Sequence, residues 1–210
     1  MRTAALVVVW GGLALLSGCA TMTADECLGG NWSRIGYQDG TNGYPVSRLG
    51  DHERACAAHG VGVNARAYLE AREQGLEEYC TPSRGYYVGS NGRNYAGVCP
   101  AWSEADFLAG YADGRVIHEA QRDVSRARSD IQTYENRIRK LRKDIDAARS
   151  RERDATGTVG RGREESEEVR GMRANLRRAA VYLPPARRRH EFAQRELDRV
   201  TRRYRPAYGW

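Results

Sequence analysis

The chain has 210 residues and a formal net charge of +7, which allows one modest domain plus an extension. Two phenylalanines against twelve tyrosines and 23 glycines predict a lean apolar core that gains from covalent links. Neither a GxSxG nor an HExxH motif is present, which excludes the hydrolase classes that depend on those motifs.

The first nineteen residues have the pattern of an export signal. Arg2 precedes an apolar run that is too short to span a membrane. The run ends in LSGC at residues 16–19, which resembles the lipobox of bacterial lipoproteins. That resemblance implies that residues 1–18 are a signal peptide and that Cys19 becomes an N-terminus carrying diacylglycerol and palmitate. An ordinary secretory signal peptide is the alternative.

The export pattern predicts a location in the cell envelope. Residues 19–26 would form a lipidated tether, and its acyl chains make the membrane the first partner. Ala20 follows the cysteine, where an aspartate would indicate retention at the inner membrane. We therefore expect an outer-membrane lipoprotein that faces the periplasm, with no nucleic-acid partner and no cofactor.

Residues 27–114 are rich in glycine, tyrosine and cysteine, and they predict a small head domain of short helices. Polar residues that can cap a helix start precede each apolar segment, and a glycine follows each one. The expected starts are Asn31, Ser47 or Asp51, Asn64 and Ser103, and the expected ends are Gly40, Gly60, Gly75 and Gly114. We place the domain boundary near Gly114.

Three segments of this head align without gaps. They are SRIGYQDG (33–40), YLEAREQG (68–75) and FLAGYADG (107–114). Their fourth residue is always small, and a small residue inside a helix permits a close helix crossing. The alternative gives Asp39 and Asp113 a catalytic role as paired carboxylates. We favour packing and turn formation, because an acid beside a glycine is common in turns.

The stretch YYVGSNGRNYAG, residues 86–97, has the pattern of a short β-hairpin. Asn91-Gly92 suits a type I′ turn, which would place Val88 opposite Tyr95.

Four cysteines remain besides Cys19, and an even number in an oxidising compartment predicts two disulfides. Three pairings are possible. Cys80 and Cys99 flank the expected hairpin, so a bond between them would close its base. By elimination, Cys27 would then pair with Cys56.

A possible functional cluster lies in DHERACAAHG, residues 51–60. His52, Cys56 and His59 would share one helix face, as weak candidates for metal ligands. The two histidines could also act with Asp39 or Asp113 as acid and base in an envelope hydrolase. We favour a disulfide at Cys56, which leaves no metal site, and we expect no catalytic residue.

Several motifs follow one another in the head. They are Trp32, Ile35-Gly36-Tyr37-x-Asp39-Gly40, His52, Cys56, His59-Gly60-Val61, Tyr68, Gly75-Leu76, Tyr79-Cys80 and Tyr95-x-Gly97-Val98-Cys99-Pro100. Together, over roughly residues 19–115, they resemble a bacterial lipoprotein family catalogued as domain of unknown function 2799. Ala71 stands where that family is expected to have glycine. The resemblance implies an exported, lipid-anchored domain and brings no activity with it.

Residues 115–204 carry a heptad repeat in two arms. The first arm has Ile117, Val124, Ile131, Ile138 and Ile145 at a, and Ala120, Ala127, Tyr134, Leu141 and Ala148 at d. The second has Val169, Leu176, Leu183, His190, Leu197 and Tyr204 at a, and Met172, Ala179, Ala186, Ala193 and Val200 at d.

The arms are similar in length, which predicts a long antiparallel helical hairpin of the coiled-coil type. Its turn would lie at 155–162, its second arm would break at Pro184-Pro185, and 205–210 would form a tail. The alternative is a parallel homodimer of the first arm, in which attractive and repulsive charge pairs balance. The fold class is therefore mainly α: a small disulfide-stapled helical head with one β-hairpin, followed by this helical hairpin.

The net positive charge of the chain comes from its second half. Residues 20–114 hold 7 Arg against 12 acids, whereas residues 115–210 hold 26 Arg and Lys against 15 acids. A solvated helix face is the simplest explanation. The functional alternative is an anion-binding stalk, because Arg pairs with phosphate and carboxylate. Its candidate residues are Arg137, Arg139, Lys140, Arg142, Lys143, Arg187, Arg188 and Arg189.

These observations favour a non-catalytic, lipid-anchored envelope protein with a structural or binding role. Its expected partners are lipopolysaccharide phosphates, anionic phospholipid headgroups, peptidoglycan carboxylates or an envelope protein.

Overall fold

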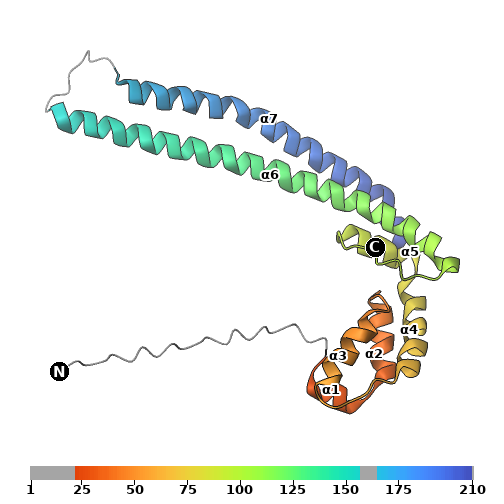
Figure 1. The fold of residues 1–210 in the computed structure, drawn as a ribbon. Helices are drawn as coiled ribbons and strands as arrows, with labels where there is room; N and C mark the ends of the chain where they lie inside the picture. Colours follow the sequence, from red (N-terminus) through yellow and green to blue (C-terminus); the bar gives the residue numbers. More distant parts are fainter. Residues whose placement is uncertain (1–21, 157–164, 210) are drawn as a thin grey trace, which may run out of the picture. The chain divides into compact units, whose positions relative to one another are not determined.

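The computed structural model describes residues 22–156 and 165–209, which are mainly helical and contain no strand. The helices are α1 (Ala24–Gly29), α2 (Trp32–Thr41), α3 (Arg48–Ala57), α4 (Ala65–Tyr79), α5 (Pro82–Ser90), α6 (Ala101–Thr156), α7 (Glu167–Tyr204) and the 3-10 helix η1 (Arg205–Tyr208) (Figure 1). The mainly α prediction is confirmed. None of the helices in these ranges is long and apolar enough to cross a membrane. The predicted signal peptide, Cys19 and most of the predicted turn lie outside the described residues.

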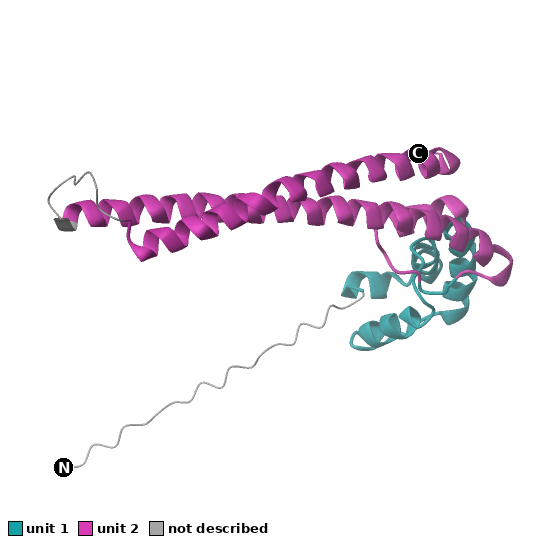
Figure 2. Cartoon of the chain, turned by 90° about the horizontal axis from the view of Figure 1, so that it is seen from above, with its two compact units in different colours: residues 1–79, 96–98 teal, residues 80–95, 99–210 magenta. Residues whose placement is uncertain are grey.

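The chain divides into two compact units (Figure 2). Unit 1 contains the residues up to Tyr79 together with 96–98, and unit 2 contains 80–95 together with the residues from Cys99 onward. The predicted boundary near Gly114 does not coincide with this division. It falls inside α6, which continues through Gly114 without a break.

Unit 1 is built on α2 and α4, with α1 and α3 attached to them. Asn31 and Asn64 start α2 and α4 as predicted, because each side chain accepts a backbone N–H bond from the first turn. A disulfide between Cys27 and Cys56 joins α1 to α3, so this predicted pairing is confirmed. Both sulfur-bearing residues are fully buried, next to Tyr68 and the other apolar residues of the core.

Helices α2 and α4 cross in direct backbone contact. A Cβ on Gly36 would overlap the carbonyl oxygen of Tyr68, and one on Gly40 would overlap that of Arg72. Gly75 of α4 lies equally close to the α2 backbone. The predicted close crossing is therefore present. Gly40 and Gly75 lie inside their helices, so the prediction that they end these helices is wrong.

Residues 82–90 form α5, so the predicted β-hairpin is wrong. Thr81 accepts a backbone N–H bond at the helix start, and Pro82 occupies the first turn, which is a strong helix-starting combination. Asn91-Gly92 does supply a positive φ, at Gly92, but there it ends the helix rather than turning a hairpin.

Helix α5 crosses α6 in the same way as α2 crosses α4. Gly85 and Gly89 face carbonyl oxygens of α6, while Gly110 and Gly114 face carbonyl oxygens at the start and middle of α5. Gly114 is thus a third glycine that was expected to end a helix and instead allows two helices to touch.

The two crossings are copies of one motif. GYQDGTNG at residues 36–43 matches GYYVGSNG at 85–92. In both, an asparagine side chain donates to the carbonyl four residues earlier, at 2.7 Å for Asn42 and 2.8 Å for Asn91. The next glycine has a φ of +70° in the first copy and +68° in the second. The chain therefore contains the same helix pair twice.

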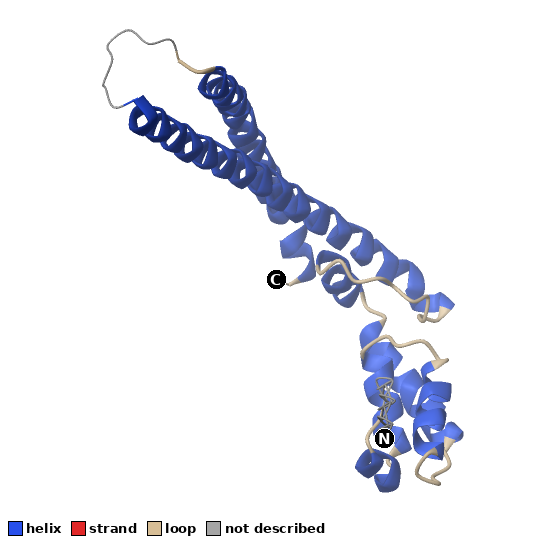
Figure 3. Ribbon diagram, turned by 60° about the vertical axis from the view of Figure 1, so that its left-hand side comes forward, coloured by secondary structure: helices blue, strands red, loops and turns tan. Residues whose placement is uncertain are grey.

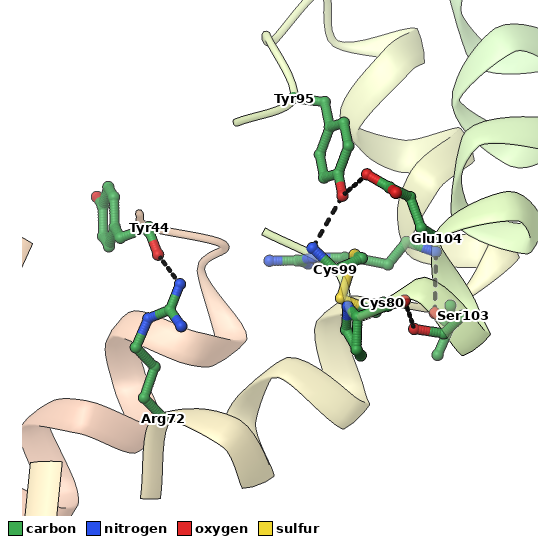
Figure 4. The surroundings of a disulfide bond; sticks show 10 residues. Tyr44, Arg72, Cys80, Tyr95, Cys99, Ser103 and Glu104 are labelled. Carbon is green, nitrogen blue, oxygen red and sulfur yellow. Dashed lines mark hydrogen bonds between the residues drawn. A yellow bond between two sulfur atoms is a disulfide. The ribbon is translucent and has the colours of Figure 1, made fainter. Parts of the chain in front are cut away.

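Each copy also has its own disulfide. Cys80 and Cys99 are bonded, which confirms the second predicted pairing. This bond joins the segments that precede α5 and α6, as the first disulfide joins those that precede α2 and α4. Near it, the Tyr95 hydroxyl accepts the Cys99 N–H at 2.8 Å and donates to Glu104 at 3.0 Å (Figure 4).

Helices α6 and α7 lie side by side and antiparallel in unit 2 (Figures 1 and 3). The ion pairs between them run Asp130–Arg189, Glu135–Arg187 and Arg151–Glu168, so residue numbers fall along α7 as they rise along α6. Every predicted a and d residue is buried or partly buried. The predicted antiparallel pair of long helices is therefore present.

The predicted break at Pro184-Pro185 is wrong, because α7 continues through both prolines. Each proline removes one helical N–H bond, and the carbonyl groups left without it belong to Ala180 and Val181. Both of these residues are exposed, so water can satisfy their carbonyl oxygens.

The close crossing of α2 and α4 leads to a prediction about folding stability. We expect Gly36→Ala to lower the free energy of unfolding by about 3 kcal/mol, because the new methyl group would meet the α4 backbone. The matched control is Gly171→Ala in α7, where the methyl group meets open space. That change should raise stability by about 0.5–1 kcal/mol. Urea denaturation followed by circular dichroism measures both, and equal effects would contradict the crossing.

Candidate anion-binding surface

The residues considered as metal ligands do not come together. Cys56 is bonded to Cys27, His52 is buried with 2% of its surface exposed, and His59 is exposed. In the described ranges, no group of three or more His, Cys, Asp or Glu is arranged to hold a metal ion. The cysteine therefore offers no thiolate, and the two histidines have different surroundings.

Asp39 is the centre of a buried polar cluster that ties three helices together. It is 6% exposed, and its Oδ2 accepts the Tyr68 hydroxyl at 2.7 Å. The same oxygen lies 2.7 Å from Nε2 of His52, and Oδ1 lies 3.3 Å from Nε of Arg48. Because Asp39 belongs to α2, Tyr68 to α4 and the other two partners, Arg48 and His52, to α3, the cluster fixes α3 on the helix pair.

The second copy of the motif shows that the crossing itself does not need this cluster. Val88 and Phe107 stand where the first copy has Asp39 and Tyr68. In the second copy, residues 91–100 connect the helices without an inserted helix. The charged cluster therefore belongs to the docking of α3. Burial, followed by the hydrogen bond to Asp39, raises the pKa of Tyr68, so its hydroxyl stays protonated.

Asp113, the other predicted carboxylate, belongs to unit 2, whereas Asp39 belongs to unit 1. It is partly buried and accepts the Tyr208 hydroxyl at 2.6 Å, which fastens η1 to α6. Burial and this hydrogen bond raise the pKa of Tyr208 to about 12. Each of the two acids thus has a local structural partner.

The eight predicted anion-binding residues all lie exposed on the α6–α7 hairpin. Arg187 pairs with Glu135 at 2.9 Å and Arg189 pairs with Asp130 at 3.5 Å. The other six make no ion pair within the part of the chain that the structure describes, and Arg139 bonds the uncharged Asn136. Most of the predicted set therefore carries uncompensated charge.

The helix register explains why these cations lack partners. Seven residues further along α6 from Glu135 is Arg142, and the residue opposite it, seven residues before Arg187 on the antiparallel α7, is Ala180. One heptad beyond Asp130–Arg189 stand Arg137 and Tyr182. An acid opposite each of these two arginines would form an ion pair across the helices, but both positions hold an uncharged residue. As a result, the middle of the hairpin carries an excess of positive charge, and we call it the cationic stretch.

Helix α7 adds four arginines that the sequence analysis did not single out, which are Arg170, Arg173, Arg177 and Arg178. Between Glu168 and Glu191 there is no acid, while seven arginines occur. They are Arg170, Arg173, Arg177, Arg178, Arg187, Arg188 and Arg189. The absence of acids over 22 residues was the available signal. Facing them on α6, residues 136–143 hold five cations and no acid.

A groove of about 550 Å³ lies between the helices within this stretch, and we call it the cationic groove. Its floor consists of Ile138, Leu176, Ala180, Leu183 and Pro184. Its rim consists of Arg139, Arg142, Arg177 and Arg187, with Glu135 as the one acid in this lining. The surface thus combines an apolar floor with a positive rim.

The fold and this surface define a helical protein with two disulfide-clamped helix pairs and a cationic helical hairpin. Residues 31–116 match the family described as "Protein of unknown function (DUF2799)", which confirms the family predicted for this segment. No curated protein and no solved structure matches the chain.

The two aspartates that the sequence analysis paired should differ in their effect on stability. We expect Asp39→Asn to lower the free energy of unfolding by about 2–3 kcal/mol, because the new amide nitrogen cannot accept bonds inside the core. Asp113→Asn is the matched control and should cost less than about 1 kcal/mol, since water reaches that site. Thermal and urea unfolding of both variants provide the comparison, and an Asp39→Asn effect no larger than that of the control would contradict the assignment.

Proposed function

We propose that this chain is a non-catalytic, lipid-anchored protein of the cell envelope that binds an anionic envelope component through its helical hairpin. In this proposal, residues 1–18 are removed and Cys19 carries the acyl chains that hold the protein in the outer membrane, facing the periplasm. The α6–α7 pair then acts as a two-helix coiled coil that presents its cations to the ligand.

The observation that carries the proposal is the cationic stretch of the hairpin, where Arg142 and Arg137 face Ala180 and Tyr182 instead of acids. Elsewhere along the same seam, arginines are paired across the helices. Guanidinium groups bind phosphate and carboxylate through two parallel hydrogen bonds. Phosphates of lipopolysaccharide or phospholipid and carboxylates of peptidoglycan therefore match this surface.

The burial of the polar cluster supports a binding role over the alternative of an envelope hydrolase. His52 and Asp39 are almost fully buried, and both hold α3 in place. His59, the second proposed histidine, lies exposed beyond the end of α3. A general base must reach a substrate proton within hydrogen-bond distance, which this burial prevents for His52.

Retention on anionic surfaces tests the proposal. The full chain with Cys19→Ala, which cannot carry an acyl anchor, should bind phosphatidylglycerol-containing vesicles or lipopolysaccharide at low ionic strength and dissociate as salt is added. The triple variant Arg137→Gln, Arg142→Gln, Arg177→Gln should lose about 100-fold in affinity, since each cation near an anionic membrane contributes about 1 kcal/mol. Co-sedimentation at several salt concentrations measures both.

The matched control removes three arginines that already have acid partners: Arg126→Gln, Arg189→Gln and Arg199→Gln. Both triple variants lower the net charge by the same amount. An equal loss of binding in the two would reduce the effect to net charge and contradict a local surface. No retention of the parent chain on vesicles, lipopolysaccharide or peptidoglycan would remove the proposed function.

A further inference from the structure

We propose that the cationic groove binds one anionic phospholipid of the phosphatidylglycerol type, with its phosphate at the arginine rim and an acyl chain along the apolar floor. The inference rests on the proposed function and names its ligand.

The rim is open to an anion only over one heptad of the hairpin. At one end, Glu135 neutralises Arg187 at 2.9 Å. At the other end, Arg149 and Arg173 share Glu165, at 3.3 Å and 3.0 Å. Between these two ends, where acids already pair with the arginines, the uncharged Ala180 lies opposite the rim cations.

The charge that remains belongs to three arginines. They are Arg139, Arg142 and Arg177, which come from both helices and have no ion pair among the described residues. An exposed arginine pair with a carboxylate contributes little to folding, so the lack of acids here costs the hairpin little. A phosphate that lies between α6 and α7 can contact cations of both helices.

The floor of the groove distinguishes a lipid from a soluble polyanion. Ile138 is buried, Leu176 and Leu183 are partly buried, and the short side chain of Ala180 leaves the hollow between them. Pro184 extends this apolar strip into an exposed part of α7. A peptidoglycan carboxylate or a bare phosphate would leave the strip in water, whereas an acyl chain covers it.

The volume of the groove agrees with the binding of one small-molecule ligand. At about 550 Å³ it lies within the usual range of 300–1,000 Å³ for pockets that hold one small molecule. A second copy of the hairpin is a poor occupant, because it would bring the same excess of arginine to the same face. One phospholipid supplies a negative headgroup and a narrow apolar chain together.

A second groove between the same helices serves as an internal comparison. Its floor includes Pro185 and Phe192, which is 65% exposed, so the two grooves are similarly apolar. Its rim, however, contains three acids and three arginines: Asp123, Asp130, Glu196, Arg126, Arg188 and Arg189. Because these charges balance, they give no net electrostatic attraction for an anionic headgroup. We therefore expect an anionic lipid to bind the cationic groove in preference to this one.

The test uses a soluble lipid on the full chain with Cys19→Ala. The probes are a short-chain phosphatidylglycerol below its micelle concentration, the matching short-chain phosphatidylcholine, and glycerophosphoglycerol, which has the headgroup without chains. Isothermal titration calorimetry should give the tightest binding for the anionic lipid. The other two should bind on the order of tenfold more weakly, because each lacks one of the two recognised features.

The critical variant is Ala180→Glu, which places an acid opposite Arg142, as Glu135 stands opposite Arg187. It extends into the groove and offsets the charge of Arg142, and glutamate is well tolerated in helices. Binding of the anionic lipid should fall on the order of tenfold or more. The control is Gln194→Glu, which adds the same charge at the same heptad position two heptads away, opposite Arg128. It should bind the lipid as the parent does.

Several outcomes overturn the inference, and they separate it from the proposed function. Equal binding by Ala180→Glu and Gln194→Glu would show that the lipid does not occupy the groove. Equal binding of glycerophosphoglycerol and the lipid would show that the floor contributes nothing. If the parent chain is retained on anionic vesicles but does not bind the short-chain lipid, the groove inference fails and the proposed function stands. If no anionic surface retains the parent chain, the proposed function fails as well.

Discussion

Backbone-to-backbone contact between helices is the constraint on which the head of this protein depends. Gly36 and Gly40 bring α2 onto α4, and Gly85 and Gly89 bring α5 onto α6. At such short separations, Cα–H groups contact carbonyl oxygens and the helices gain dispersion energy along their backbones. A chain with two phenylalanines cannot rely on large apolar side chains, so close crossings and disulfides stabilise its small core.

The two copies of the crossing show which features belong to the motif and which were added. The glycines, the asparagine end of the first helix and the disulfide occur in both. The buried carboxylate of Asp39 occurs only in the first, where α3 is inserted and supplies His52 and Arg48. A buried charge is tolerated only with close partners, so the cluster and the inserted helix depend on each other.

The features that could be predicted from sequence are those with a local or periodic cause. Helix starts at Asn31 and Asn64, both disulfide pairings and the antiparallel pairing of α6 with α7 were predicted correctly. The β-hairpin was wrong because Asn91-Gly92 signals a positive φ, which a helix end uses as readily as a hairpin turn. The roles of Gly40, Gly75 and Gly114 could not be predicted from their own segments, because the partner that requires glycine is a distant helix. The match between 36–43 and 85–92 was the missed clue.

The seam of the hairpin also determines its surface. Once the a and d residues fix the register, each flanking position has one counterpart on the other helix, so charge pairing can be judged position by position. Acids stand opposite arginines at Glu135, Asp130 and Glu168, which shows that pairing is compatible with this packing. An uncharged residue at Ala180 brings no gain in burial, since it is exposed, and it leaves Arg142 without an acid partner. Tyr182 is also exposed, but its ring stacks on Tyr134 of α6. At Ala180, folding stability therefore gives no reason for the missing acid, whereas an anion bound between the two helices would offset the charge of Arg142 and cover the apolar floor beside it.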